Sequence, residues 1–125
     1  MMETVKQEKK YILCVDDDAL NIDLLMEYLE DEYEIDSVVD GQQCLDSVAQ
    51  RAPDLILLDI MMPVMDGKEA CVILKASEKT KSIPIIILSG RSYPEDIKEM
   101  YDKGANSYLS KPFSAEQLLT TIRAF

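Results

Sequence analysis

Residues able to hold a metal ion or an anion follow four strand-like stretches of this sequence. In chain order they are Asp16, Asp17, Asp18, Asp59, Ser89 and Lys111. If the four stretches are parallel strands of one sheet, their carboxyl ends bring these side chains to one edge. Carboxylates crowded in this way repel one another, so cations must compensate their charge. Because carboxylates offer oxygen ligands, the pattern favours Mg²⁺ or Mn²⁺, with Lys111 as the second cation.

Five stretches have the length and composition of β-strands. Three of them, Tyr11–Val15, Leu55–Leu58 and Ile83–Leu88, are apolar throughout, which is typical of strands buried on both faces of a parallel sheet. The other two, Glu34–Val39 and Ser107–Ser110, are more polar. We therefore expect these two strands at the edges of the sheet.

Helical stretches separate the strands. Residues 19–30 carry apolar side chains on one face at helical spacing, and a third helix should begin near Gly67. Gly104 is expected at the C-terminus of the fourth helix. Three further starts are marked by residue pairs with the spacing of helix caps, namely Asp40 and Gln43, Ser92 and Glu95, and Ser114 and Gln117.

Strand and helix thus alternate five times along the chain. This alternation predicts an α/β protein with a doubly wound, five-stranded parallel sheet of the flavodoxin-like (βα)5 type. The strand order 2-1-3-4-5 puts the second and fifth strands at the edges, in agreement with their polarity. We expect one domain over residues 11–125, preceded by a flexible N-terminal segment over residues 1–10.

The composition argues against several classes of function. The 24 acidic and 13 basic residues give a formal net charge of −11, so we expect this domain not to bind nucleic acid. There is no histidine, which excludes an imidazole base. No apolar stretch approaches the ~20 residues of a membrane span, and the polar N-terminus does not resemble a signal peptide. A cytoplasmic protein without membrane contact is the resulting expectation.

The three cysteines have no metal-binding or redox spacing. Cys14, Cys44 and Cys71 form no CxxC pair and lie in apolar or helical contexts. We predict that they are buried, reduced thiols.

Helix capping could explain some of the acidic residues without any site. An aspartate that follows a strand is often the N-cap of the next helix, and one of Asp16–Asp18 should serve in this way. Capping does not readily explain Asp59, because the sequence after it is IMMP and not a helix start. Asp59 is therefore the strongest candidate for a chemical role.

Four motifs in this order resemble those of response regulator receiver domains. They are VDDD at 15–18, LLDIMMPVMDG at 57–67, ILSG at 87–90 and YLSKPF at 108–113, and the resemblance extends from residue 11 to residue 125. It implies that Asp59 is the phosphoacceptor. It also implies that Lys111 pairs with Asp59 and then with the phosphoryl group, and that Ser89 contacts a phosphoryl oxygen.

The resemblance further implies a set of metal ligands and a switch. Asp17 and Asp59 would bind Mg²⁺ through their side chains, Met61 through its backbone carbonyl, and Asp16 mainly through water. Tyr108 matches an aromatic position whose ring orientation reports activation. The peptide bond before Pro112 is cis in the family.

The implied function is that of a receiver in a two-component phosphorelay. Its partner would be a histidine kinase or a histidine phosphotransfer protein, and a small acyl phosphate could also donate the phosphoryl group. Phosphorylation would switch the face formed by the fourth helix, fifth strand and fifth helix, through which a homodimer could form. Such a protein is no ordinary enzyme, although it assists its own phosphorylation and dephosphorylation. Met61 cannot orient a water and Arg91 places a cation at the rim, so slow hydrolysis is expected.

Two other functions share parts of the pattern. A haloacid-dehalogenase-like phosphatase would use Asp16 and Asp18, but it leaves Asp59 unexplained and normally needs a longer chain. A flavodoxin-like electron carrier shares the fold, but its phosphate loop is rich in hydroxyl groups. Here the corresponding loop is DDDA, which would repel a flavin phosphate.

Overall fold

The computed structural model describes residues 9–62, 64–91 and 93–125, and it contains one parallel sheet in the order β2-β1-β3-β4-β5. The predicted fold class, strand order and edge strands are confirmed. Of the predicted flexible segment, residues 1–8 lie outside the described residues. The strands are β1 Tyr11–Val15, β2 Glu34–Val38, β3 Leu55–Asp59, β4 Ile85–Ser89 and β5 Ser107–Ser110.

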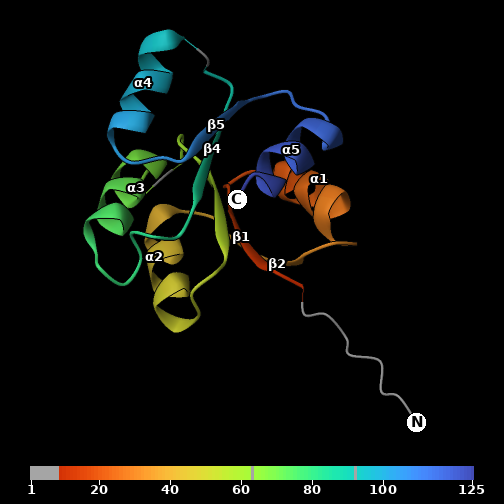
Figure 1. Cartoon of the computed structure of the whole chain (residues 1–125), viewed down its shortest axis with the longest axis horizontal. Coiled ribbons are helices and arrows are strands. Elements are labelled where there is room, and N and C mark those ends of the chain that lie inside the picture. Colours follow the sequence, from red (N-terminus) through yellow and green to blue (C-terminus); the bar gives the residue numbers. More distant parts are fainter. Residues whose placement is uncertain (1–8, 63, 92) are drawn as a thin grey trace.

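Helices cover both faces of the sheet. Helices α1 and α5 lie on one side, and α2, α3 and α4 lie on the other (Figure 1). Their bounds are α1 Ala19–Leu29, α2 Gly41–Gln50, α3 Gly67–Ala76, α4 Pro94–Asp102 and α5 Ala115–Arg123.

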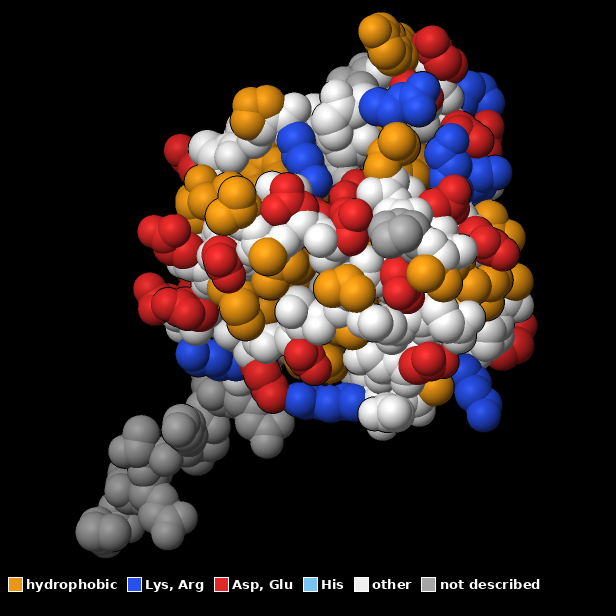
Figure 2. Space-filling view, turned by 180° about the vertical axis from the view of Figure 1, so that it is seen from behind, with side chains coloured by type: hydrophobic (Ala, Val, Ile, Leu, Met, Phe, Trp, Pro, Cys, Tyr) orange, Lys and Arg blue, Asp and Glu red, His pale blue; other side chains and the backbone are white. Residues whose placement is uncertain are grey.

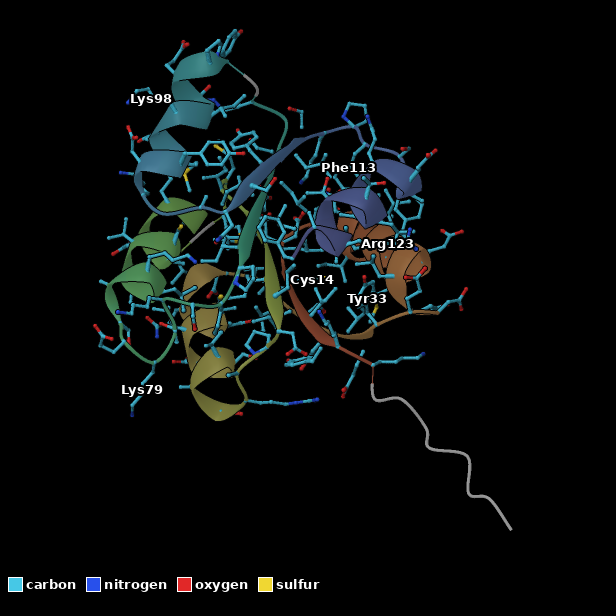
Figure 3. The ribbon with its side chains drawn as sticks, in the orientation of Figure 1. Cys14, Tyr33, Lys79, Lys98, Phe113 and Arg123 are labelled. Atoms are coloured by element: carbon cyan, nitrogen blue, oxygen red, sulfur yellow. The ribbon has the colours of Figure 1, made fainter. Side chains whose placement is uncertain are left out.

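Successive side chains of the central strands point to opposite faces and build two separate cores. Leu13 of β1 packs with α2, α3 and α4, whereas its neighbours Ile12 and Cys14 pack with α1 and α5. Figure 3 shows Cys14 inside the protein and Phe113 beside α5. All of β1, β3 and β4 is buried, which holds the carboxyl ends of these strands in fixed positions.

The cysteines are free and buried, as predicted. Burial raises the pKa of the Cys14 and Cys44 thiols to about 12, and it also raises the pKa of Cys71. The thiols are therefore protonated and act as small apolar groups of the core.

Side-chain caps begin four of the helices. The capping residues are Asp18 for α1, Asp40 for α2, Asp66 for α3 and Ser114 for α5. The cap at Asp40 and the reciprocal capping box of Ser114 with Gln117 were predicted, and Gly104 has the expected positive φ, 105°.

The predicted start of α4 is wrong. The helix begins at Pro94, and Tyr93 occupies the cap position without a side-chain cap hydrogen bond. Glu95 is therefore the second helical residue and not the third, so it lacks the spacing of a capping box with Ser92. Ser92 itself lies outside the described residues.

The predicted bounds of β4 are also wrong. It begins at Ile85 and not at Ile83, because Pro84 has no N–H to donate to a neighbouring strand. β3 and β4 each extend one residue further than predicted, so Asp59 and Ser89 are the last residues of their strands. Their backbones are thereby fixed by the sheet.

The chain carries more acidic than basic side chains. Figure 2 shows acidic side chains spread over the face opposite that of Figure 1, with fewer basic side chains between them. Within the described ranges, no helix is long and apolar enough to cross a membrane.

Candidate functional site

Three aspartates from the ends of two adjacent strands form a cluster at the carboxyl end of the sheet. Asp16 follows β1, and Asp59 ends the adjacent strand β3. Carboxylate oxygens of Asp16, Asp17 and Asp59 all lie within 4.8 Å of one another. Asp16 is 1% exposed and Asp59 is 8% exposed, whereas Asp17 faces solvent. An all-oxygen cluster with one open side fits Mg²⁺ or Mn²⁺, which take carboxylate ligands and retain water.

Lys111 brings a positive charge to this cluster. Its Nζ lies 3.1 Å from Oδ2 of Asp16 and 3.7 Å from Oδ2 of Asp59. The preceding residue ends β5, and the peptide bond to Pro112 is cis, as expected. Three carboxylates and one ammonium leave two negative charges uncompensated, which is the charge balance of a single divalent cation.

Hydrogen bonds orient the two buried carboxylates. The backbone N–H of Asp18 donates to Oδ1 of Asp16 at 2.9 Å, and Nδ2 of Asn21 donates to Oδ2 of Asp16 at 3.2 Å. The backbone N–H of Met61 donates to Oδ1 of Asp59 at 3.2 Å. Asn21 was not predicted from the sequence, although its place in the first turn of α1 directs it toward the loop after β1.

The surroundings of Asp59 disfavour its charge. Burial raises the pKa of Asp59 to about 6, against the attraction of Lys111 and the Met61 N–H, and the carboxylate of Asp16 raises it further. Asp59 is nevertheless ionised at neutral pH, because that value lies below 7. It is therefore a carboxylate that any additional cation would stabilise.

The chain passes very close to the backbone of Asp59 where α3 begins. The N–H of Gly67 donates to the carbonyl of Ile60 at 2.9 Å, and a Cβ at Gly67 would lie 2.2 Å from the carbonyl oxygen of Asp59. Only glycine permits this approach. The MDG segment thus packs the loop after β3 against the end of the strand that carries Asp59.

Ser89, Arg91 and Tyr108 form a hydrogen-bonded path away from the cluster. The N–H of Arg91 donates to Oγ of Ser89 at 3.0 Å, and the hydroxyl of Tyr108 donates to the carbonyl of Arg91. The Tyr108 ring is half-buried against the core on the α4 side. Met61 and Arg91 both line a cavity of about 380 Å³ beside the cluster.

Asp18 does not belong to the cluster. Its carboxylate accepts the Leu20 N–H at 2.9 Å as the cap of α1, and the side chain is exposed. A haloacid-dehalogenase-like phosphatase requires Asp16 and Asp18 at one site. Here Asp16 instead clusters with Asp17 and Asp59. The phosphatase alternative has no support in this arrangement.

Comparison with known protein families gives a match over nearly the whole chain. The model of the response regulator receiver domain matches residues 12–123. The DNA-binding dual master transcriptional regulator RpaA of Synechocystis is 39% identical over 114 residues, which cover 90% of this chain and 47% of that protein. The DNA-binding response regulator MtrA of Mycobacterium tuberculosis is 36% identical over 124 residues, covering 98% and 52%. The chain spans about half the length of these relatives.

Solved structures agree with this match. The chemotaxis protein CheY4 of Vibrio cholerae has a TM-score of 0.87 and 32% identity, covering 93% of this chain and 98% of that one. The receiver domain of the sensor histidine kinase PA1611 of Pseudomonas aeruginosa has a TM-score of 0.86 and 31% identity, covering 93% and 96%. That structure contains a magnesium ion coordinated in the active site cleft.

Removing the charge of Asp59 should stabilise the protein at neutral pH. The pKa of this carboxyl is about 6 in the folded protein against an ordinary value of 3.8. The folded state therefore binds more protons between these values, and the free energy of unfolding falls as the pH rises through this window. Without divalent ions, we expect Asp59→Asn to raise the free energy of unfolding at neutral pH by roughly 1–3 kcal/mol. The gain should disappear below about pH 4.

Urea unfolding over a series of pH values measures this effect. Asp23→Asn, which removes an exposed carboxylate of α1, is the matched control and should show no comparable gain. Equal stability of the Asp59→Asn variant and the wild type at neutral pH would contradict the prediction.

Proposed function

This chain belongs to the response regulator receiver domain family, and we propose that it accepts a phosphoryl group on Asp59. Receiver domains of this family are phosphoacceptors of two-component signalling, not conventional enzymes. The donor is the phosphohistidine of a histidine kinase or histidine phosphotransfer protein, or a small acyl phosphate. The observation that carries the proposal is the buried Asp59 carboxylate, with Asp16, Asp17 and the Lys111 ammonium around it.

Asp59 is a nucleophile that needs no general base. It is ionised at neutral pH, so one carboxylate oxygen can attack phosphorus directly while the bond from phosphorus to the donor nitrogen breaks. The products are an acyl phosphate on Asp59 and the free imidazole of the donor. Phosphoryl transfer depends mainly on positioning and charge neutralisation, and this chain positions the nucleophile through the Met61 N–H and Lys111.

In this proposal Asp17 and Asp59 would hold Mg²⁺ or Mn²⁺ through their side chains. Met61 would bind it through its backbone carbonyl, and Asp16 mainly through water. The two uncompensated negative charges of the cluster support a divalent ion. When bound, such an ion neutralises charge on the phosphoryl oxygens during transfer. Lys111, which directly follows β5, completes the neutralisation.

Ser89 and Met61 act on the phosphorylated state. Ser89 ends β4 next to the Asp59 strand, so its hydroxyl can donate to a phosphoryl oxygen. Met61 is 62% exposed beside the site, but its side chain has no group that could orient a water for hydrolysis. We propose that the chain assists phosphorylation more than dephosphorylation, so the acyl phosphate is hydrolysed slowly.

The output of this receiver is the face of α4, β5 and α5. Ser89 and Tyr108 are both hydrogen-bonded to the backbone of Arg91, so a displacement of Ser89 toward a phosphoryl group would be transmitted to Tyr108 on β5. A partner protein or a second copy of this chain binds that face. The relatives named as DNA-binding are about twice as long as this chain, and we propose no nucleic-acid contact for this domain.

Asp59 should be the only residue that acquires a phosphoryl group. Wild-type protein incubated with acetyl phosphate and Mg²⁺ should gain one phosphoryl mass in intact mass spectrometry, and chelation of the metal should prevent the gain. Asp59→Asn keeps the shape but removes the nucleophilic charge, so it should gain none. Asp18→Asn, which alters only the α1 cap, is the control that should still be phosphorylated. Phosphorylation of the Asp59→Asn variant would refute the assignment.

Mg²⁺ affinity should depend on Asp17 and not on Asp18. The Asp17 carboxylate belongs to the cluster, whereas that of Asp18 accepts the N–H of Leu20. In calorimetric titrations, Asp17→Ala should weaken Mg²⁺ binding about tenfold or more, because even the loss of an outer-shell partner of a ligand costs this much. Asp18→Ala should cost only roughly 1 kcal/mol of stability through the lost cap. A larger loss of affinity in the Asp18 variant would contradict the ligand set.

Ser89→Ala should separate phosphorylation from the output. The variant retains Asp59 and should still bind beryllofluoride, a stable mimic of the phosphoryl group. Amide chemical shifts from Tyr93 to Phe125 should change on beryllofluoride binding in the wild type and change much less in the variant. Full shifts in the variant, or none in the wild type, would exclude the route through Ser89 and Tyr108.

A further inference from the structure

An ion pair whose two side chains differ strongly in exposure joins the loop after β4 to α4. Nε of Arg91 lies 3.9 Å from Oδ2 of Asp96, in the first turn of α4. The Arg91 side chain is 57% exposed, whereas that of Asp96 is 17% exposed. Oδ2 of Asp96 is buried and accepts no hydrogen bond from any described residue. The guanidinium thus neutralises Asp96 at a distance without satisfying it, which makes this contact easy to break.

A cavity connects this ion pair to the acidic cluster. It has a volume of about 380 Å³, and its lining includes Asp17 and Met61 on one side and Arg91 and Asp96 on the other. The Met61 N–H contacts Asp59, so the cavity opens beside the phosphorylated carboxylate of the proposed function. Arg91, Asp96 and the cluster residue Asp17 thus border the same open space.

The backbone of Arg91 is held by hydrogen bonds, whereas, among the described residues, only the attraction of Asp96 and Glu99 holds its exposed side chain. Its N–H donates to Ser89, and its carbonyl accepts from Tyr108. The guanidinium can therefore change its partner while the Arg91 backbone keeps both hydrogen bonds.

Phosphorylation changes the charge balance in a way that favours this movement. The Asp59 carboxylate loses one negative charge when it becomes an acyl phosphate, and the phosphoryl group adds about two. A cluster balanced by Lys111 and one divalent ion thus gains roughly one unit of negative charge. A guanidinium binds phosphoryl oxygens with charge-assisted hydrogen bonds, a stronger contact than its present one with Asp96.

We propose that Asp96 is a competing anion that holds Arg91 away from Asp59 until phosphorylation draws the guanidinium across the cavity. This inference rests on the proposed function and deepens it. Asp96 touches neither the phosphoryl group nor the metal, so it is a positioning residue. By holding Arg91, it lowers the affinity of the site for a phosphoryl group.

Beryllofluoride binding in the presence of Mg²⁺ tests the proposal in four proteins: wild type, Asp96→Asn, Arg91→Gln and the double variant. Asp96→Asn should tighten beryllofluoride binding about two- to fivefold, the range expected for release of a partly exposed ion pair. Arg91→Gln should weaken binding. In the Arg91→Gln background, Asp96→Asn should have no effect, because no guanidinium remains to be released.

A matched control distinguishes this competition from a general change of charge. Glu95→Gln removes the same charge from the same helical turn, but Glu95 is not among the residues that line the cavity. It should leave the affinity unchanged. An equal gain in Glu95→Gln, an equal gain of Asp96→Asn in both backgrounds, or no gain at all would overturn the proposal. Failure of the wild type itself to bind beryllofluoride would overturn the proposed function, and the competition with it.

Discussion

Repulsion among three carboxylates is the constraint on which this end of the domain depends. Parallel strands β1 and β3 are adjacent and fully buried, so their carboxyl ends force Asp16 and Asp59 together in a place with little water. Lys111, the Met61 N–H and Asn21 compensate part of the charge. The compensation is incomplete, since burial first and then the charge of Asp16 still raise the pKa of Asp59. The fold thus carries a local electrostatic cost that a divalent ion would relieve.

Much of this arrangement was predictable from the sequence, because it follows from strand ends. Buried strands appear in the sequence as continuous apolar runs, and the residue at the end of each run is fixed at one edge of the sheet. Asp59 and Lys111 could be found in this way, and Asp18 could be anticipated as a helix cap. Contacts made across loops were not predictable. Asp96 pairs with Arg91 in a helix that begins at Pro94, one residue later than the Ser92 cap implied.

The loop from β4 to α4 links the buried part of the sheet beside Asp59 to the edge strand β5. Ser89 is anchored by the sheet beside Asp59, whereas Tyr108 lies on the edge strand β5, where less of the chain covers it. The Arg91 backbone joins the two by hydrogen bonds on both sides. Any change in what Ser89 binds therefore alters the best position of a loop that also holds Tyr108. The coupling runs through one short segment, and it requires no rearrangement of the core.

The β4–α4 loop responds to added negative charge because its cation, Arg91, is held less tightly than Lys111. Lys111 already lies 3.1 Å from Asp16, so its ammonium cannot follow added charge without weakening that pair. Arg91 is more exposed and more loosely held. An additional negative charge at Asp59 therefore acts most strongly on the β4–α4 loop, where the compensating group is most mobile. Because that loop continues into α4, the demand for charge compensation at the site reaches the surface through this helix.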